Sequence, residues 1–349
     1  MWFIESEENL SLGDRCAATD SFAILRERQA VNLPGDLNLA VKRWLQGQGG
    51  LAAKAKALSA AYRKGADSGH VNTAAYIAAR LPATYAANEK VLREVAQVLP
   101  DFNPASVLDV GAGPGTAGWA ALGRWPEIAK LVQVERDNDF YALAQYFNRE
   151  GGLDVLAKAD LQNTDFNGLT ETHRADLVLA TYVLAELPIA KMAGAARQLW
   201  AMSQQALVLI EPGTPDGFAR LRIVRDCLLK EGAVVVAPCT HQGACPMVAG
   251  DWCHFKVRLQ RSRAHMHAKQ AHVPFEDEAF SYLVLSRQNV ATPGSRVMRP
   301  PHIDKIAATL KLCDEDGLHN LSIASRNKAS YKRAKHVAWG DVWSDDNEP

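Results

Sequence analysis

The stretch Val107-Leu-Asp-Val-Gly111-Ala-Gly113-Pro-Gly115-Thr116 decides the fold class of this 349-residue chain. An apolar run typical of a buried strand leads into three alternating glycines, and the residues that follow should open a helix. Glycines let the backbone approach a ligand closely, because a side chain there would block it. The spacing places Thr116 where a dinucleotide-binding fingerprint has its third glycine. The loop therefore favours S-adenosylmethionine over NAD.

Acidic side chains complete the predicted cofactor site. Glu135 ends the next strand, where a carboxylate can accept hydrogen bonds from both ribose hydroxyls. Asp160 follows the run predicted as the third strand and is expected to bond the adenine amino group. The predicted cofactor-binding residues are Asp109, Gly111, Gly113, Gly115, Glu135 and Asp160. A glycine turn in some other α/β protein is the alternative.

From residue 106 onward, short β-rich runs alternate with helical patterns, as a doubly wound parallel sheet requires. The runs read SVLDV (106–110), LVQVE (131–135), DVLAKA (154–159), ADLVLAT (175–181) and ALVLIEP (206–212). Two later runs, 280–286 and 318–325, are expected to supply the closing antiparallel hairpin of a seven-stranded sheet. The pattern predicts an α/β fold, a Rossmann-like class I methyltransferase domain, over residues 101–326.

The remaining parts of the chain have a different sequence pattern. Residues 1–100 are predicted to form a helical domain, with helices at 36–45, 51–64 and 73–99. Pro82 should kink or split the last of these, because its ring removes a helical hydrogen bond. Residues 327–349 are predicted to form a basic and aromatic tail.

Composition limits the class of protein. With 48% hydrophobic and 22% charged residues, the chain is typical of globular proteins. Its apolar runs are far too short to cross a bilayer, so we expect no membrane partner. The N-terminus, MWFIESEENL, is acidic, unlike a secretory signal or a mitochondrial presequence. We therefore expect a cytoplasmic protein, in which thiols stay reduced.

Three cysteines, Cys239, Cys245 and Cys253, lie within fifteen residues in a predicted metal-binding insertion at 237–275. Clustered cysteines in a reducing compartment are candidate metal ligands. Zinc sites usually have C-x2–4-C pairs, whereas this wider spacing and the proline after Cys245 favour an iron–sulfur loop. Cys313 is the economical fourth ligand, with His241 or His254 as substitutes. Zinc and unliganded thiols are the alternatives.

The net charge of zero conceals a division, because residues 220–340 hold 19 Lys and Arg against 10 Asp and Glu. Two basic runs there contain no acid, and the second lies near Tyr331 and Trp339. Cations bind phosphates and aromatic rings stack on unpaired bases, so we predict an RNA-binding surface. Its predicted residues are Lys256, Arg258, Arg261, Arg263, Lys332, Arg333 and Lys335. An ordinary solvated surface is the alternative.

Several of these segments together resemble the small-ribosomal-subunit methyltransferase-like family, which has bacterial and mitochondrial members. The resemblance rests on the glycine loop, the cysteine segment and the stretches Tyr76–Tyr85, Glu211–Thr214, Phe280–Leu285 and Tyr331–Asp341. It implies a 4Fe-4S cluster on Cys239, Cys245, Cys253 and Cys313. It also implies binding to the small ribosomal subunit during assembly, and it does not decide whether members catalyse methyl transfer.

The segment after the fourth predicted strand carries no methyl-acceptor signature. It reads Thr181-Tyr-Val-Leu-Ala-Glu186, without the Asn/Asp-Pro-Pro-Tyr/Phe of many amino-methylating enzymes of nucleic acids, so we assign no catalytic residue. The leading hypothesis is an rRNA-binding, S-adenosylmethionine-dependent methyltransferase-like protein with a cluster, acting in ribosome biogenesis or translation. It is expected to be a monomer off the ribosome. The alternatives are a non-catalytic assembly factor and a small-molecule methyltransferase with structural zinc.

Overall fold

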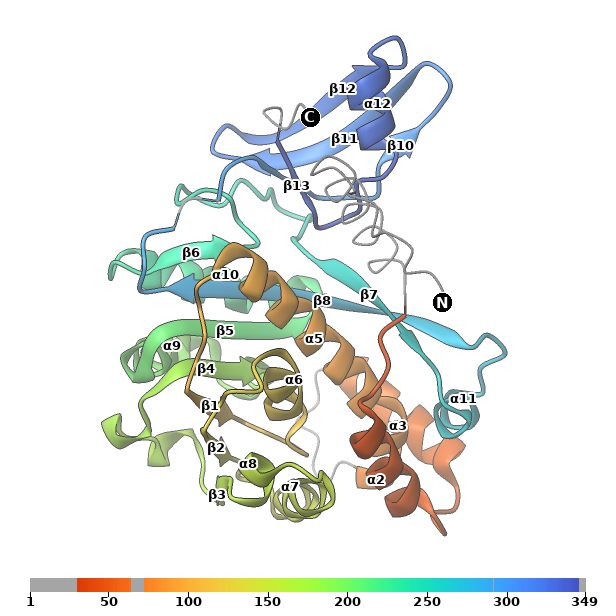
Figure 1. Ribbon diagram of the computed structural model, residues 1–349, viewed down its shortest axis with the longest axis vertical. Coiled ribbons are helices and arrows are strands. Elements are labelled where there is room, and N and C mark those ends of the chain that lie inside the picture. The colour runs from red at the N-terminus through yellow and green to blue at the C-terminus, as the bar shows by residue number, and fades with distance from the viewer. Residues whose placement is uncertain (1–29, 64–71, 291, 345–349) are drawn as a thin grey trace, which may run out of the picture.

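The computed structural model describes residues 30–63, 72–290 and 292–344, shown in Figure 1. The acidic N-terminal stretch and the end of the predicted tail lie outside these residues. Two sheets form the framework, a large one in the middle of the chain and a smaller one near the C-terminus. Within the described residues, no helix has the length and apolar character needed to cross a membrane.

The large sheet has the strand order β3-β2-β1-β4-β5-β8-β6. Its first five strands are parallel and β8 runs antiparallel to both of its neighbours, the order of a class I methyltransferase. An eighth strand, β7, pairs with the first half of β8. The strands are β1 (Ser106–Val110), β2 (Lys130–Val134), β3 (Asp160–Gln162), β4 (Ala175–Thr181), β5 (Ser203–Pro212), β6 (Val234–Ala237), β7 (Phe255–Gln260) and β8 (Phe275–Ser286).

Two strand predictions were wrong. The run 154–159 begins with the short helix α8 (Asp154–Ala157), and β3 starts only at Asp160. The run 318–325 does not close the large sheet, because it lies in the small sheet as β12 (Gly317–Ala324). Its expected place beside β8 is taken by β6. The antiparallel strand at 280–286 was predicted correctly.

Helices cover both faces of the large sheet, because successive strand residues are mostly apolar and point to opposite sides. Val107 of β1 packs in the cluster formed with α5 (Leu81–Val98), α6 (Thr116–Arg124) and α7 (Asn138–Glu150). Leu108 packs in the opposite cluster, against α9 (Met192–Met202) and α10 (Pro215–Leu229). Both faces are thus buried, as expected for a parallel sheet.

The N-terminal helices are α2 (Gly35–Leu45), α3 (Leu51–Arg63) and α4 (Thr73–Ala79). Pro82 lies in the first turn of α5, so the predicted long helix is split at Arg80, as expected. A small alanine-rich core joins α3 and α4 to α11 (Arg263–Lys269), which belongs to the cysteine insertion. The helical N-terminal part therefore packs against the middle of the chain.

The small sheet lies at one end of the molecule, with the cysteine segment between it and the large sheet in Figure 1. Leu310 and Leu312 of β11 form its core with Ala334 and Trp343, which come from the predicted tail. The elements of this sheet are β9 (Ser295–Val297), β10 (His302–Ile303), β11 (Ala307–Asp314), β12, α12 (Lys328–Ala334) and β13 (Val342–Trp343).

Candidate functional site

The glycine loop lies at the carboxyl end of β1, and its three glycines all have positive φ. A Cβ atom on Gly111 would lie 2.6 Å from Cγ2 of Val183, and one on Gly115 would lie 2.8 Å from Nε2 of Gln133. A Cβ atom on Gly113 would meet no atom within 4 Å. Two of the three glycines are therefore required by close packing as well as by backbone conformation.

Glu135 follows β2 at the same edge of the sheet and holds the glycine loop. One carboxylate oxygen accepts a hydrogen bond from the N–H of Gly113 at 2.8 Å, and the other accepts one from Asp137, also at 2.8 Å. Burial raises the pKa of Glu135. A carboxylate can accept about four hydrogen bonds, so Glu135 keeps acceptor positions for a ligand in the pocket that it lines.

Asp109 is buried below the loop and does not line the pocket. Its carboxyl accepts a hydrogen bond from the N–H of Gly118, in the first turns of α6, at 3.1 Å. Burial raises the pKa of Asp109 to about 7. The structure thus places Asp109 where it positions the glycine loop and its helix.

Asp160 is not at the place that its predicted role requires. It opens β3 and pairs with Val132 in the middle of β2, whereas the cofactor edge lies at the other end of these strands. Its carboxylate accepts a hydrogen bond from Gln162. The prediction was wrong because the preceding run is helical, which moves the strand downstream. Thr164 and Asp165 are the residues that follow β3 and line the pocket.

The pocket beside the loop is open and polar, and its residues come from the carboxyl ends of β1, β2, β3 and β4. Arg136 and Glu186, on opposite walls, form an ion pair of 3.1 Å. The other lining residues include Gly111, Glu135, Thr164, Asp165, Phe166, Asn167, Tyr182, Val183, Lys191 and Gln198. Ligands of open α/β sheets bind at this edge, so the pocket has the position expected for the cofactor.

Tyr182 is a pocket residue to which the sequence analysis gave no role. Its φ is +60°, a conformation that costs a non-glycine residue on the order of 1–3 kcal/mol. Its N–H donates to the carbonyl of Ile210 at 2.7 Å. Its hydroxyl is buried, without a hydrogen-bond partner in the described part of the chain. Its place directly after β4 is the only sequence signal that could have indicated it.

The four predicted metal ligands line one pocket, although they come from two separate segments of the chain. Cys239, Cys245 and Cys253 lie in the connection between β6 and β7, and Cys313 lies on β11 of the small sheet. All four are free thiols. His241 lines the same pocket, with its Nε2 4.0 Å from the sulfur of Cys313. His254 does not line it.

Three of the four thiols of this pocket lie in an environment that opposes their ionisation. Burial, together with the negative charge of neighbouring thiolates, raises the pKa of Cys253 well above its usual value and that of Cys313 to about 12. Burial also raises the pKa of Cys245. Binding a metal requires thiolates, and the metal's positive charge offsets these costs.

Two buried arginines line the cysteine pocket. Arg225 of α10 donates to the carbonyls of His241 and Gly243. Arg296 of β9 donates to the carbonyl of Pro238 and forms a 2.7 Å ion pair with Glu94. These cations shape the loop and favour negative charge in the pocket.

Within the described residues, no three His, Cys, Asp or Glu side chains are close enough to hold one metal ion.

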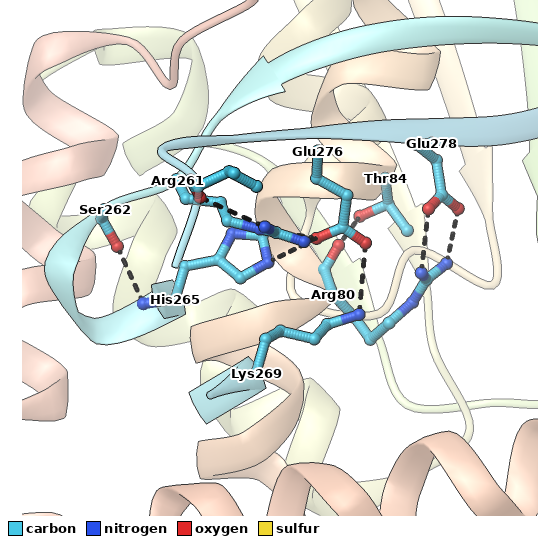
Figure 2. Close-up of polar contacts among 9 residues, drawn as sticks. Arg80, Thr84, Arg261, Ser262, His265, Lys269, Glu276 and Glu278 are labelled. Atoms are coloured by element: carbon cyan, nitrogen blue, oxygen red, sulfur yellow. Dashed lines mark hydrogen bonds and ion pairs between the residues drawn. The ribbon is translucent and has the colours of Figure 1, made fainter. Parts of the chain in front are cut away.

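The first basic run is largely neutralised by acids of β8, as Figure 2 shows around Glu276. Glu276 forms ion pairs with Arg261 and Lys269 and contacts the buried His265 at 3.0 Å. Arg258 forms an exposed pair with Asp277. The run itself contains no acidic residue, but the adjacent strand β8 supplies acidic partners. Of its four predicted RNA-binding residues, Lys256 and Arg263 are exposed and form no ion pair with another residue that the structure describes.

The second basic run forms α12 and the turn after it. Lys332 and Lys335 are exposed, and the ammonium group of Lys335 lies 5.1 Å from the centre of the Tyr331 ring. The guanidinium of Arg333 stacks on Trp343 at 4.1 Å and donates to the carbonyl of Ser344. Arg333 therefore holds the helix on the small sheet, while the two lysines remain at the surface.

Fold and pockets define a methyltransferase-fold protein with a second, cysteine-lined site beside a small C-terminal sheet. The chain belongs to the family described as mitochondrial small ribosomal subunit Rsm22, whose model matches residues 70–344.

Two relatives and one solved structure illustrate the likeness. The chain is 27% identical to the human mitochondrial ribosome assembly protein METTL17, over 76% of this chain and 61% of that protein. It is 26% identical to the mitochondrial Rsm22-cox11 tandem protein 2 of Schizosaccharomyces pombe, over 77% of this chain and 42% of that protein. The structure of magnesium protoporphyrin IX methyltransferase from Synechocystis with bound SAM is 14% identical, with a TM-score of 0.38, over 80% of this chain and 100% of that one. The chain thus spans about half of its relatives' length.

Proposed function

We propose that this chain is an S-adenosylmethionine-binding factor that binds rRNA of the small ribosomal subunit during ribosome biogenesis and carries a 4Fe-4S cluster. The observation that carries the proposal is that four cysteines from two separate segments line one pocket, next to a methyltransferase domain with a complete glycine loop. Membership of the Rsm22 family supports the ribosomal partner. We expect the protein to be cytoplasmic, and a monomer off the ribosome.

The sequence of the cysteine segment favours a cluster over zinc, because its C-x5-C-x7-C spacing is wide and a proline follows Cys245. Zn–S bonds of about 2.3 Å bring four tetrahedral sulfurs within about 3.8 Å of one another. A 4Fe-4S cluster takes one thiolate at each of four irons, so it suits a wider ring of ligands. Cys239, Cys245, Cys253 and Cys313 would hold it, and the nearby arginines would offset its negative charge.

The proposed RNA-binding surface consists of the basic side chains that the two runs leave exposed, Lys256, Arg263, Lys332 and Lys335. They lie on β7, α11 and the α12 segment. Phosphate contacts by such cations make binding dependent on salt. Arg258 and Arg261 are already paired with acids and are expected to contribute less.

Methyl transfer to rRNA is the second candidate function. The pocket continues past Gly111 to Tyr182, Glu186 and Lys191 after β4, which leaves space for an acceptor beside the cofactor. Bound S-adenosylmethionine would supply the methyl group. The chain's own part would be to orient cofactor and acceptor, which is where much of such catalysis comes from. A non-catalytic assembly factor would use the same pocket only to bind the cofactor.

The test uses protein purified without oxygen, with iron and acid-labile sulfide measured per chain. We expect wild type to carry a cluster, Cys245→Ser to lose it, and the control Cys227→Ser, which lies on α10 outside the pocket, to keep it. Zinc in place of iron, or no metal in wild type, would refute the cluster.

Function is then tested with small-subunit particles from cells that lack the protein. Co-sedimentation that is lost in Cys245→Ser would support a cluster-dependent assembly factor. Transfer of tritium from labelled S-adenosylmethionine to the rRNA, abolished by Glu135→Ala, would establish methyl transfer. Co-sedimentation without tritium would make the chain a non-catalytic factor, and no co-sedimentation would refute the ribosomal role.

A further inference from the structure

The cofactor pocket and the cysteine pocket are joined by one short turn, Glu211–Thr214, at the end of β5. Thr214 caps α10, and its hydroxyl accepts a hydrogen bond from the N–H of Gly217. Glu211, at the start of the turn, bonds to the wall of the cofactor pocket, and Gly213, two residues later, bonds to the cysteine segment. The turn is thus a contact shared by two sites that are distant in sequence.

On the cysteine side, Trp252 is the contact. Its indole N–H donates to the carbonyl of Gly213 at 2.9 Å, and the next residue along the chain is Cys253. A second connection runs through Arg225, which lies on the helix that Thr214 caps and bonds to the loop between Cys239 and Cys245. A metal that holds the cysteines in place would therefore also hold the turn Glu211–Thr214 in place.

On the cofactor side, Glu211 is the contact. It is fully buried, and one of its carboxyl oxygens accepts a hydrogen bond from the N–H of Leu184 at 2.9 Å. Leu184 follows Val183, whose side chain covers Gly111 of the glycine loop. The neighbouring Tyr182 has the positive φ described above. A strained residue keeps its conformation only while its surroundings hold it, so loosening the contacts of Glu211 would let this wall relax.

The turn itself has little freedom to absorb a displacement. A Cβ atom on Gly213 would lie 2.7 Å from the backbone carbon of Ala279, and the N–H of Gly213 donates to the carbonyl of that residue at 3.1 Å. Glu211 pairs with Ser281 in the ladder between β5 and β8. A shift of Trp252 is therefore transmitted along the turn.

We propose that Trp252 and Glu211 are positioning residues that couple the two sites, so that a metal centre on the cysteines strengthens S-adenosylmethionine binding. The inference rests on the proposed function, because it requires a metal centre and a cofactor. Coupling between two binding sites is reciprocal, so the cofactor must strengthen metal retention by the same factor. Typical couplings change affinity about 5- to 150-fold.

The test measures the affinity for S-adenosylhomocysteine by calorimetry, in metal-loaded protein and after anaerobic removal of the metal with an iron chelator. We expect removal to weaken binding at least about 5-fold, the lower end of such couplings. Metal-loaded Trp252→Phe keeps an aromatic side chain but loses the N–H donor. It should therefore keep its metal and bind S-adenosylhomocysteine as weakly as wild type from which the metal has been removed. Trp125→Phe, a buried tryptophan outside both pockets, should behave like wild type.

Two further readouts separate coupling from general loss of structure. Amide hydrogen exchange in residues 182–188 should rise on metal removal, and S-adenosylhomocysteine should slow metal loss in wild type but not in Trp252→Phe. Equal ligand affinity in loaded wild type and in loaded Trp252→Phe would overturn the coupling and leave the proposed function intact. Absence of any metal from wild type would overturn both.

Discussion

Glu135 accepts a hydrogen bond from the backbone N–H of Gly113 at 2.8 Å, so the acid that follows β2 directly holds the glycine loop that follows β1. The other carboxylate oxygen is bonded to Asp137. Glu135 therefore shapes the loop in addition to its predicted contact with ribose. Both tasks require the ionised carboxylate, because only that form presents acceptors on both oxygens.

Glu135→Gln should weaken S-adenosylhomocysteine binding by about 10-fold or more, which corresponds to about 1.4 kcal/mol. The amide nitrogen of glutamine would face the N–H of Gly113 or Asp137, donor against donor. Burial raises the pKa of Glu135, so affinity in wild type should also fall as the pH is lowered from 7. Calorimetry across this range should show little pH dependence in Glu135→Gln. Equal affinities of the two proteins would contradict the assignment.

Glu276 should stabilise the fold in a pH-dependent way. Burial alone would raise its pKa, but the hydrogen bond to His265 and the charge of Lys269 outweigh burial and lower the pKa to about 2. A carboxyl with a lowered folded-state pKa stabilises the fold above its unfolded-state pKa of 4.5, and this stabilisation is lost as the pH falls toward 2. Glu276→Gln should thus cost on the order of 2 kcal/mol at pH 7.

Urea unfolding of Glu276→Gln and wild type at several pH values checks this expectation. The difference in unfolding free energy should shrink as the pH falls from 5 to 3. Asp277→Asn is the matched control, because Asp277 makes an exposed pair with Arg258 and exposed pairs contribute little. A constant difference, or one of the same size in the control, would show that the charge of Glu276 has no special role.

Features that depend on local sequence could be predicted. The glycine loop, β1, β4 and the break at Pro82 each follow from a few adjacent residues. Asp160 was misplaced because the apolar residues of 154–159 fit a strand or a short helix equally well, and only packing decides between them. The prediction that Cys313 is a ligand rested on its being the economical fourth cysteine and on the resemblance, since the small sheet that carries it was not recognised.

The basic runs show the same limit more clearly. Read along the chain, residues 256–263 contain cations and no acid, which predicts a positive surface. In the fold, β8 lies beside them and brings Glu276 and Asp277 opposite Arg261 and Arg258. The net charge of the surface around a strand depends on the strands beside it in the sheet. A single run of sequence does not show which distant residues those strands bring.

Arg296 should be among the residues on which stability depends most. It is buried, donates to two backbone carbonyls, those of Pro238 and Gly340, and pairs with Glu94 of α5. Arg296→Met would leave the carboxylate of Glu94 buried and unpaired, which typically costs about 3–5 kcal/mol. Adding Glu94→Gln removes that stranded charge, so the double variant should be more stable than Arg296→Met alone. Denaturant unfolding of the variants tests this, and strictly additive losses would contradict it.

Gly111 and Val183 should show the same kind of dependence, in which the second substitution restores part of what the first removes. Gly111→Ala introduces a Cβ atom 2.6 Å from Cγ2 of Val183, in addition to the strain of its positive φ. Gly113→Ala, the matched control, carries similar backbone strain but meets no atom within 4 Å.

We therefore expect Gly111→Ala to weaken S-adenosylhomocysteine binding much more than Gly113→Ala, and Val183→Ala to recover part of the loss. Val183→Ala removes both γ-methyl groups, so the new Cβ on residue 111 no longer overlaps them, but the Cβ of residue 183 stays 2.9 Å away. The strain of φ +67° stays as well, which is why recovery should be partial. Equal losses in the two glycine variants, or no recovery in the double variant, would show that backbone strain alone sets the cost.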